Sequence, residues 1–429
     1  MRKAKHLFIA ATYSIISLSP ATAISADELS TSQNNGKDWE HLENRIKTLE
    51  KKLLKQNASF KINGFINAAL ARSDDDSKTE NWGGITNKND FAALSNIGIQ
   101  LSFSPNYYTQ ITTQLMSRGE EEWEMEAEWA YIALNPTDSL TFRFGRQKAP
   151  LYLLSEYIEV AYANPWIYAP DEVYGITGDN TYDGINLLYT IPSDHWDTTL
   201  QAMWGNNKFT HAIVGDLALN DFLTLNVTSR NESTTLRLGY TVLTADVPAV
   251  SLPLPDIPAA GISAGDTLNY AAEESDVSYL AAGFIFDNNR WLLMSEIVQL
   301  KIGGWFSDTN GAYLMTGYRF GKVMPHFTAS KMENKDPGAR DAGTITSAST
   351  GATLPLPGQA VGGIADTFIA QDQTTYTLGI RYEILPSVSL KAELSHLTDF
   401  NDSIGKFSGA AAPTKDNVNI MKLSIDSVF

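Results

Sequence analysis

Apolar and polar residues alternate along most of the chain from residue 58 onward. Alternation with a period of two is typical of β-strands that present one apolar face and one polar face. Short breaks rich in Pro, Asn, Asp, Ser and Gly interrupt the pattern and predict tight turns between antiparallel strands. These breaks are SPN (104–106), NPTD (135–138), IPSD (191–194), SRNES (229–233), DNN (287–289), FGK (320–322) and LPS (385–387).

Longer connections alternate with these turns, near 73–92, 118–121, 150–181, 205–220, 245–274, 302–310, 333–372 and 399–416. Seven tight turns and eight longer connections predict sixteen strands, with both ends of the series on the tight-turn side. This sorting is typical of outer-membrane β-barrels, which have short turns at one rim and long loops at the other. Because the strands near 222–229 and 275–286 are the least regular, fourteen and eighteen strands remain alternatives.

The stretch 122–129 carries an unusual distribution of charge. If it forms one strand, its glutamates share one face and its apolar residues the other: Glu122, Glu124, Glu126 and Glu128 against Trp123, Met125, Ala127 and Trp129. A soluble sandwich would bury the apolar face, whereas a membrane barrel would turn it to lipid and the carboxylates to a wet lumen. The sorted connections favour the barrel.

Composition is compatible with this interpretation. Hydrophobic residues make up 43% of the chain, cysteine is absent, and beyond residue 25 no apolar run is long enough for a helical span. The formal net charge of −17 argues against nucleic acid as a partner.

The amino terminus has the features of a secretory signal. Arg2, Lys3 and Lys5 precede an apolar run, and Ala21-Thr22-Ala23 forms a cleavage site, so 1–23 is the predicted signal peptide, with 1–26 as an alternative and a membrane anchor as a further one. Its removal takes away three cations and no acid, which changes the net charge from −17 to −20.

Residues 27–37 form a polar segment that we expect to be flexible, and residues 38–57 show a different periodicity. Their apolar residues recur at alternating spacings of three and four, at Trp39, Leu42, Ile46, Leu49 and Leu53. This period predicts a short coiled coil, and one amphipathic helix on the protein's own surface is the alternative. So short a coil would form only where a larger body gathers the chains.

Several segments resemble the Gram-negative outer-membrane porins. They are LTFRFGRQKAP, SEYIEVAYANPWIYAPDEVY, GYRFGKVMPHFT, LGIRYEILPSVSLKAELS and the terminal IDSVF, and the likeness covers residues 58–429. The heptads make the chain similar to the subgroup with a periplasmic coiled coil, such as sucrose porins and DcaP-like porins. The resemblance implies a homotrimer in the outer membrane, in contact with lipid and lipopolysaccharide, with Phe429 presented to the assembly machinery. The P-E-F-G-type turn of enteric porins is absent from the third loop, so details of their constriction do not carry over.

The alternation also assigns a lumen. The apolar residues that we assign to lipid are Phe142, Phe144, Leu378, Ile380, Leu390, Leu394, Leu423 and Ile425. The alternate positions then face inward, and the basic residues among them are Lys61, Arg143, Arg237, Arg319, Arg381, Lys391 and Lys422. Closure of the barrel would place Lys61, Arg381, Lys391 and Lys422 on one wall, with the glutamate strand across the lumen or a quarter-turn away. We expect a transverse field between the two sides, with pairing between neighbouring strands, for instance Glu126 or Glu128 with Arg143, as the simpler alternative.

The third loop, 150–180, is long enough to fold into the lumen. Its carboxylates, Glu156, Glu159, Asp171 and Glu172, would select solutes by charge. Its aromatic residues would offer a track for flat apolar faces or simply fill space: Tyr152, Tyr157, Tyr162, Trp166, Tyr168 and Tyr174. Two LPLP repeats, at 252–256 and 354–358, are expected to pack on one another or on a neighbouring subunit.

The resulting prediction is an all-β, sixteen-stranded antiparallel transmembrane barrel that lets small solutes or ions diffuse through the outer membrane. The net charge and the glutamates favour cations or neutral dipoles. A structural, adhesive or enzymatic barrel without an open pore is the alternative. We expect no enzyme, because the match to G-x-S-x-G around Ser263 lacks the strand and helix that would expose the serine. We expect no cofactor or metal either, since the six histidines are scattered without metal-ligand spacing.

Overall fold

The computed structural model describes residues 58–429, except 76–84, 179, 212–214, 255, 257–261, 272, 304–305, 336–342, 358–359, 362–369, 402, 404 and 408–415. The predicted signal peptide, the polar segment and the coiled coil therefore lie outside the described residues. Within the described part, no helix combines the length and the apolar character needed to cross a membrane.

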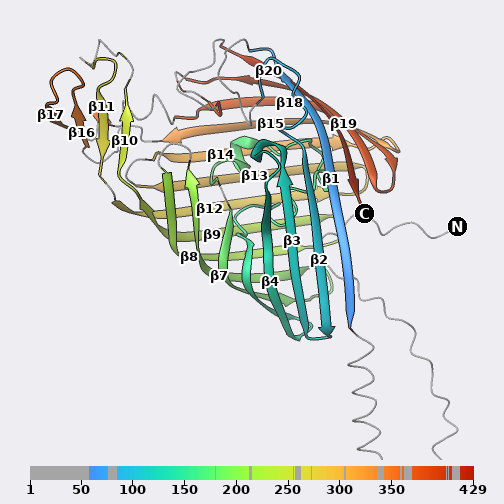
Figure 1. The fold of residues 1–429 in the computed structure, drawn as a ribbon. Coiled ribbons are helices and arrows are strands. Elements are labelled where there is room, and N and C mark those ends of the chain that lie inside the picture. Colours follow the sequence, from blue (N-terminus) through green and yellow to red (C-terminus); the bar gives the residue numbers. More distant parts are fainter. Residues whose placement is uncertain are drawn as a thin grey trace, which may run out of the picture.

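Sixteen antiparallel strands form one closed barrel, as the sorted connections predicted (Figure 1). The first strand closes the barrel on the last, with Phe65 opposite Val428 and Ser73 opposite Ile420. The barrel strands are β1 Ser59–Ser73, β2 Asn96–Asn106, β3 Thr109–Arg118, β4 Met125–Thr137, β5 Leu140–Lys148, β6 Thr181–Ile191, β7 Asp197–His211, β8 Gly215–Arg230, β9 Thr234–Val247, β12 Glu273–Asp287, β13 Trp291–Ile302, β14 Asp308–Tyr318, β15 Val323–Lys335, β18 Gln373–Leu385, β19 Val388–Thr398 and β20 Val418–Val428.

Connection lengths match the prediction at every tight turn. We call the end of the barrel with these turns the short-turn rim and the opposite end the loop rim. One long connection was predicted wrongly: β7 continues to His211 and β8 begins at Gly215, so 205–220 is mostly strand. Polar residues that extend above the apolar part of a strand carry no signal of where the strand ends.

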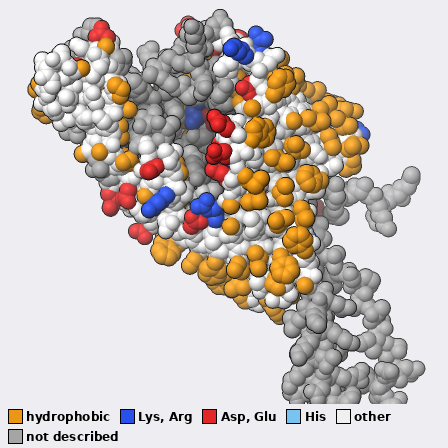
Figure 2. Space-filling model, viewed as in Figure 1, with side chains coloured by type: hydrophobic (Ala, Val, Ile, Leu, Met, Phe, Trp, Pro, Cys, Tyr) orange, Lys and Arg blue, Asp and Glu red, His pale blue; other side chains and the backbone are white. Residues whose placement is uncertain are grey.

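The outer face of the barrel is apolar. Side chains assigned to lipid by alternation are exposed there, including Leu378 (63%), Leu394 (52%) and Ile425 (45%). Figure 2 shows hydrophobic side chains spread over the visible outer wall. An exposed apolar belt around a barrel with a polar interior is the inverse of a soluble core and suits a lipid environment.

The glutamate strand departs from the prediction at both ends. Glu122 and Trp123 have positive φ values of 54° and 65°, so they form a turn after the 3₁₀ helix Gly119–Glu121, and β4 begins only at Met125. The register of β3 with β4 shifts between Gln114 and Leu115. This irregularity resets the alternation, so that Glu128 and Trp129 are both buried. A ladder of four glutamates on one face is therefore wrong.

A second sheet stands at the loop rim. It consists of β10 Val250–Pro253 and β11 Thr267–Tyr270 from the fifth loop, and β16 Gly343–Thr346 and β17 Thr353–Leu356 from the seventh (Figure 1). The strand order β10-β11-β16-β17 places the two LPLP repeats at opposite edges of this sheet. They share one apolar cluster but do not pair with each other.

Asp266 joins the two halves of this sheet. Its carboxylate accepts hydrogen bonds from the backbone N–H of Ser263 in the fifth loop, at 2.9 Å, and of Ala348 in the seventh, also at 2.9 Å. These backbone hydrogen bonds hold the pKa of the Asp266 carboxyl below its ordinary value.

We expect Asp266→Ala to loosen the fifth and seventh loops, because two backbone donors lose their common acceptor. Limited proteolysis of the folded protein should then cut these loops faster. In the wild type the two hydrogen bonds to Asp266, which we call the clasp, should persist as pH falls to about 4. The pKa of the Asp266 carboxyl is lowered in the folded protein, so the stability that these bonds contribute is lost only when pH falls below the ordinary carboxyl pKa. Asp256→Ala, at an exposed position of the same fifth loop, is the matched control. Equal cleavage of both variants would contradict the clasp.

Candidate functional site

The third loop, 149–180, folds into the barrel and reaches strands far from its own. The indole Nε1 of Trp166 donates to Thr328 Oγ1 on β15, at 2.7 Å. The backbone N–H of Leu153 donates to Glu296 on β13, at 2.8 Å. The loop contains a 3₁₀ turn, Ala161–Ala163, and a short helix, α2 Asp171–Tyr174. An inward-folded third loop is thus confirmed.

Basic side chains of the wall bind the backbone of this loop. Lys391 Nζ donates to the carbonyl oxygens of Ala161 and Trp166, both at 2.6 Å. Arg381 donates to those of Tyr162 and Asn164, at 2.7 and 3.0 Å. Only 3% of the surface of Arg381 and of Lys391 is exposed. These two cations therefore hold the loop and do not face open water.

The same wall supplies the opposite charges. Lys391 pairs with Asp426 at 3.0 Å, and Lys422 pairs with Glu393 at 2.8 Å. Glu393 also accepts the backbone N–H of Ile167 in the third loop, at 2.7 Å. Buried charges need such partners because removal from water is costly. This acidic half of the wall, Glu393 and Asp426, was missed by sequence analysis, although both residues alternate in phase with the predicted cations.

Lys61 does not belong to this group. Arg381, Lys391 and Lys422 lie on the adjacent strands β18, β19 and β20. On the next strand, the residue opposite Lys422 is Ala71. Lys61 is ten residues from Ala71, about 33 Å along β1. Adjacency of strands was predictable, but height along the barrel depends on register, which alternation alone does not define.

Two of the predicted selecting carboxylates also serve to dock the loop. Glu172 is 2% exposed, and its carboxylate accepts hydrogen bonds from Ser330 Oγ and Gln373 Nε2, both at 2.7 Å, and from Thr375 Oγ1. The neighbouring Asp171 lies 3.8 Å from Lys406 Nζ of the eighth loop. Both carboxylates of α2 are therefore occupied by wall and loop donors.

The aromatic residues divide into two sets. Tyr152, Trp166 and Tyr174 are buried in one apolar cluster with wall residues of β12 to β15. Ring centroids lie 5.5 Å apart between Trp166 and Tyr313, close to perpendicular. Burial raises the pKa of the Tyr174 hydroxyl well above its ordinary value. These rings fill space, which is the simpler of the two alternatives.

Tyr157, Tyr162 and Tyr168 keep part of their surface accessible, and Tyr168 is 38% exposed. The hydroxyl of Tyr162 donates to the carbonyl of Pro386 at 2.6 Å, and the Arg381 guanidinium lies 4.8 Å from its ring centroid. Burial raises the pKa of Tyr157 to about 12.

Glu128 and Glu159 pair with cations that the alternation did not single out. Lys148 Nζ lies 2.6 Å from Glu128 and 3.7 Å from Glu159. Arg118 pairs with Glu128 and, at 3.0 Å, with Glu159. This cluster ties β3, β4 and β5 to the third loop. The alternative pairing of Glu126 or Glu128 with Arg143 is not the one observed.

Arginines with accessible surface lie on the wall of β5, β8 and β9. Arg143 pairs with Glu156 of the third loop at 3.0 Å, and the two side chains are 22% and 29% exposed. Burial disfavours the ionised Glu156, but the attraction of Arg143, with Arg237 and Arg230 beyond it, outweighs this and holds the pKa of the carboxyl below its ordinary value.

Arg237 donates to the carbonyl oxygen of Pro150. It also donates to Thr228 Oγ1, at 3.3 Å. Among the described residues, neither Arg237 nor Arg230 has a carboxylate within salt-bridge distance, and the Nε atoms of both have no hydrogen-bond partner. Arg319, by contrast, forms a double hydrogen bond with Asp287 at 2.7 and 2.9 Å. Arg230 was missed because it was assigned to a tight turn, although it continues the inward positions of β8.

α2 packs directly against Gly311 of β14. A Cβ at Gly311 would lie 2.2 Å from the carbonyl oxygen of Glu172. We therefore expect Gly311→Val to weaken docking of the third loop by about 1–3 kcal/mol, as overpacking does in cores. Hydrogen exchange of backbone amides 171–175 should become faster. Gly303→Val is the control, because no atom lies within 4 Å of a Cβ there. Unchanged exchange in Gly311→Val would contradict this packing.

Comparison with known proteins supports the fold. No protein-family model matches the chain, and no curated protein sequence matches it. Among solved structures, the chain is similar to the outer-membrane protein OmpT of Vibrio cholerae in a trimer form (TM-score 0.50, 12% identity, covering 87% of this chain and 99% of that one). OmpF of Salmonella typhi in complex with daunomycin is similar (TM-score 0.52, 12% identity, 87% and 98%), as is the outer-membrane channel DcaP of Acinetobacter baumannii (TM-score 0.52, 10% identity, 87% and 98%). The chain therefore has the fold of the sixteen-stranded outer-membrane porins.

Proposed function

We propose that the protein is an outer-membrane porin through which small hydrophilic solutes diffuse passively. The single observation that carries this proposal is the inverted barrel: sixteen strands with an apolar outer face around a polar and charged interior. A closed barrel satisfies its backbone hydrogen bonds internally, so it can lie in lipid while the interior stays wet. The likeness to the outer-membrane channel DcaP supports the same conclusion.

The third loop is the proposed constriction. It crosses the lumen with its apolar residues packed on β12 to β15. Its partly exposed segment, which contains Glu156 and Tyr157, faces Arg143, Arg230 and Arg237. A solute that passes between them meets one acidic residue and three cations. The transverse field that the sequence predicts is therefore proposed to lie between Glu156 and these three arginines. It is not proposed at Arg381, Lys391 and Lys422.

Small anions are the solutes that this arrangement favours. The prediction of cations rested on the net charge and on a glutamate ladder that does not exist. Glu128 and Glu159 are paired with Arg118 and Lys148, whereas Arg230 and Arg237 form no salt bridge among the described residues. Uncompensated cations in a lumen with low-dielectric walls concentrate anions.

A barrel without an open pore is the second candidate. It is favoured by the reach of the third loop, which contacts Asn96 on β2, Asn226 on β8 and Arg381 on β18. A loop bound at so many points around the wall could fill the lumen. The bilayer recordings below separate the two candidates.

Planar bilayer recordings of the purified protein should show discrete conductance steps, and reversal potentials in a KCl gradient should show anion preference. The double variant Arg230→Gln, Arg237→Gln should lower the chloride-to-potassium permeability ratio about two- to fivefold, the effect of charge interactions worth up to ~1 kcal/mol. Arg290→Gln, at an exposed position in a turn of the short-turn rim, is the control. An absence of steps would favour the plugged barrel, and a cation preference would contradict the role of the arginines.

A homotrimer in contact with outer-membrane lipid and lipopolysaccharide is the proposed assembly, by analogy with the OmpT trimer form. Residues 38–57 are proposed as a periplasmic coiled coil after the signal peptide 1–23. Phe429, 67% exposed and held by backbone hydrogen bonds to Gly64 at 2.8 and 2.9 Å, is the proposed signal for the assembly machinery.

Deletion of residues 38–57 should lower the temperature at which trimers dissociate, because the coil links the chains only where the barrels already gather them. Semi-native gel electrophoresis after stepwise heating measures this temperature. The same deletion should leave single-channel conductance unchanged. A dissociation temperature equal to that of the full chain would exclude a role in oligomerisation.

A further inference from the structure

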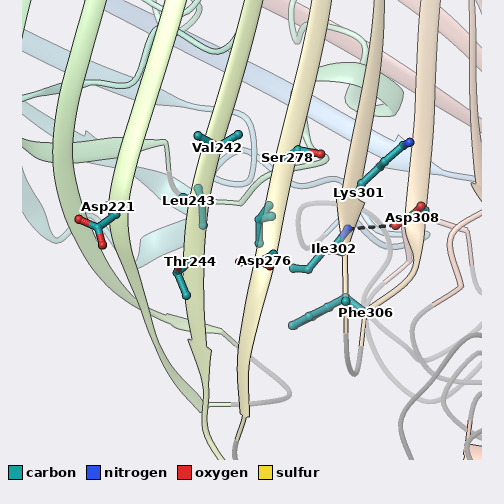
Figure 3. A pocket seen from close by; sticks show the side chains of 12 residues that line it. Asp221, Val242, Leu243, Thr244, Asp276, Ser278, Lys301, Ile302, Phe306 and Asp308 are labelled. Carbon is teal, nitrogen blue, oxygen red and sulfur yellow. Dashed lines mark hydrogen bonds between the residues drawn. The ribbon is translucent and has the colours of Figure 1, made fainter.

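A groove of about 580 Å³ opens at the loop rim between β8 and β14 (Figure 3). It lies on the outer face of the barrel. Along β9, Leu238 and Tyr240 are exposed at 55% and 49%, and Thr244 of the groove shares their orientation because alternate residues of a strand face the same side. By the same alternation, Asp276 faces outward with Leu280, and Lys301 with Ile297. The polar side chains of these three strands therefore face away from the lumen.

Charges of both signs line the groove without pairing. Asp221, Asp276 and Lys301 are exposed, and none of the three forms a salt bridge with another described residue. The register explains this, because Lys301 lies opposite Ser278 and only diagonally from Asp276. Diagonal neighbours are about 7–8 Å apart, a distance that a lysine side chain can span, but Lys301 points away from Asp276 (Figure 3). A ligand group could therefore stand between the two charges.

Polar groups line the middle of the groove, between the apolar side chains of Val242 and Phe306 (Figure 3). The hydroxyls of Thr244 and Ser278 lie among the charges, and Asp308 accepts the backbone N–H of Ile302 at 3.0 Å. Val242 and Phe306 add apolar surface (Figure 3). Toward the short-turn rim the exposed outer wall becomes apolar at Tyr240 and Leu280. A polar head with an attached acyl chain matches this sequence of surfaces.

We propose that the groove binds a lipid headgroup of the phosphoethanolamine type. The ammonium group donates to the carboxylates of Asp276 and Asp221, and a phosphate oxygen accepts from Lys301 Nζ. The acyl chains then follow the apolar wall past Tyr240. The lipid environment of this inference rests on the proposed function, but binding of the headgroup does not require an open pore.

Other headgroup classes fit less well. An anionic headgroup would meet three carboxylates, Asp221, Asp276 and Asp308, against the single cation Lys301. A divalent cation that bridges a phosphate to these acids is not favoured, because no three metal-binding side chains among the described residues are grouped to hold one. A quaternary ammonium carries the same charge as a primary one but has no N–H to donate.

Native mass spectrometry of the full chain in detergent, with equimolar phosphatidylethanolamine, phosphatidylcholine and phosphatidylglycerol, tests this proposal. We expect preferential retention of phosphatidylethanolamine. Asp276→Asn and Lys301→Gln should each reduce that preference about two- to fivefold, the range for one exposed charge interaction. Glu274→Gln, two residues away on β12 and outside the groove, and Lys208→Gln, on β7, are the matched controls and should change nothing.

A parallel incubation distinguishes the source of the headgroup. Lipopolysaccharide with a phosphoethanolamine substituent and lipopolysaccharide without it are compared in the same way. Preference for the substituted form, or for phosphatidylethanolamine, supports the site and identifies the source. Equal retention of all three phospholipids and of both lipopolysaccharides would overturn the proposed headgroup site. Equal effects of the groove variants and the control variants would overturn it as well. A protein that binds the headgroup but conducts no ions would leave this site intact while removing the proposed pore.

Discussion

The third loop can lie inside the barrel only because the wall satisfies its backbone. A chain segment without regular structure carries free N–H and C=O groups, and each costs free energy when it is buried without a partner. Lys391 and Arg381 donate to four carbonyl oxygens of the loop, and Glu393 and Glu296 accept two of its amides. The wall thus plays the part that neighbouring strands play in a sheet.

Because some wall charges bind the loop, only the others remain accessible to a solute in the lumen. A buried cation that binds a carbonyl still needs a counter-charge, and Asp426 supplies one to Lys391. The most basic stretch of the wall is therefore neutralised locally and covered by the loop. Arg230 and Arg237, on β8 and β9, form no salt bridge among the described residues and keep part of their surface accessible, although Arg237 also donates to the Pro150 carbonyl of the loop. A net charge of −17 therefore does not imply an acidic lumen, because Arg230 and Arg237 face it without a salt bridge to any described residue.

Alternation along the chain was sufficient to predict the barrel, its strand number and its lipid-facing side chains. It failed where one residue changes the phase. The irregular register beside Gln114 brings both Glu128 and Trp129 into the interior, and the positive φ at Glu122 belongs to a turn that delays the start of β4 to Met125. A one-residue shift moves every later side chain to the other face, and no signal in the residues themselves locates such a shift.

The site was harder to predict than the fold for a related reason. Alternation assigns a side chain to the lumen but does not say whether water or another segment occupies the space in front of it. Lys391 and Arg143 have the same inward orientation, yet one is buried beneath the loop and the other remains partly accessible. The difference arises from where the loop docks, and docking depends on small residues of the far wall. Gly311 admits the backbone of α2, and a Cβ at Gly283 would lie 3.1 Å from the side chain of Leu153. Such glycines have no distinctive pattern in an alternating strand, so the path of the loop, and with it the selectivity of the lumen, emerges only once the strands are in register.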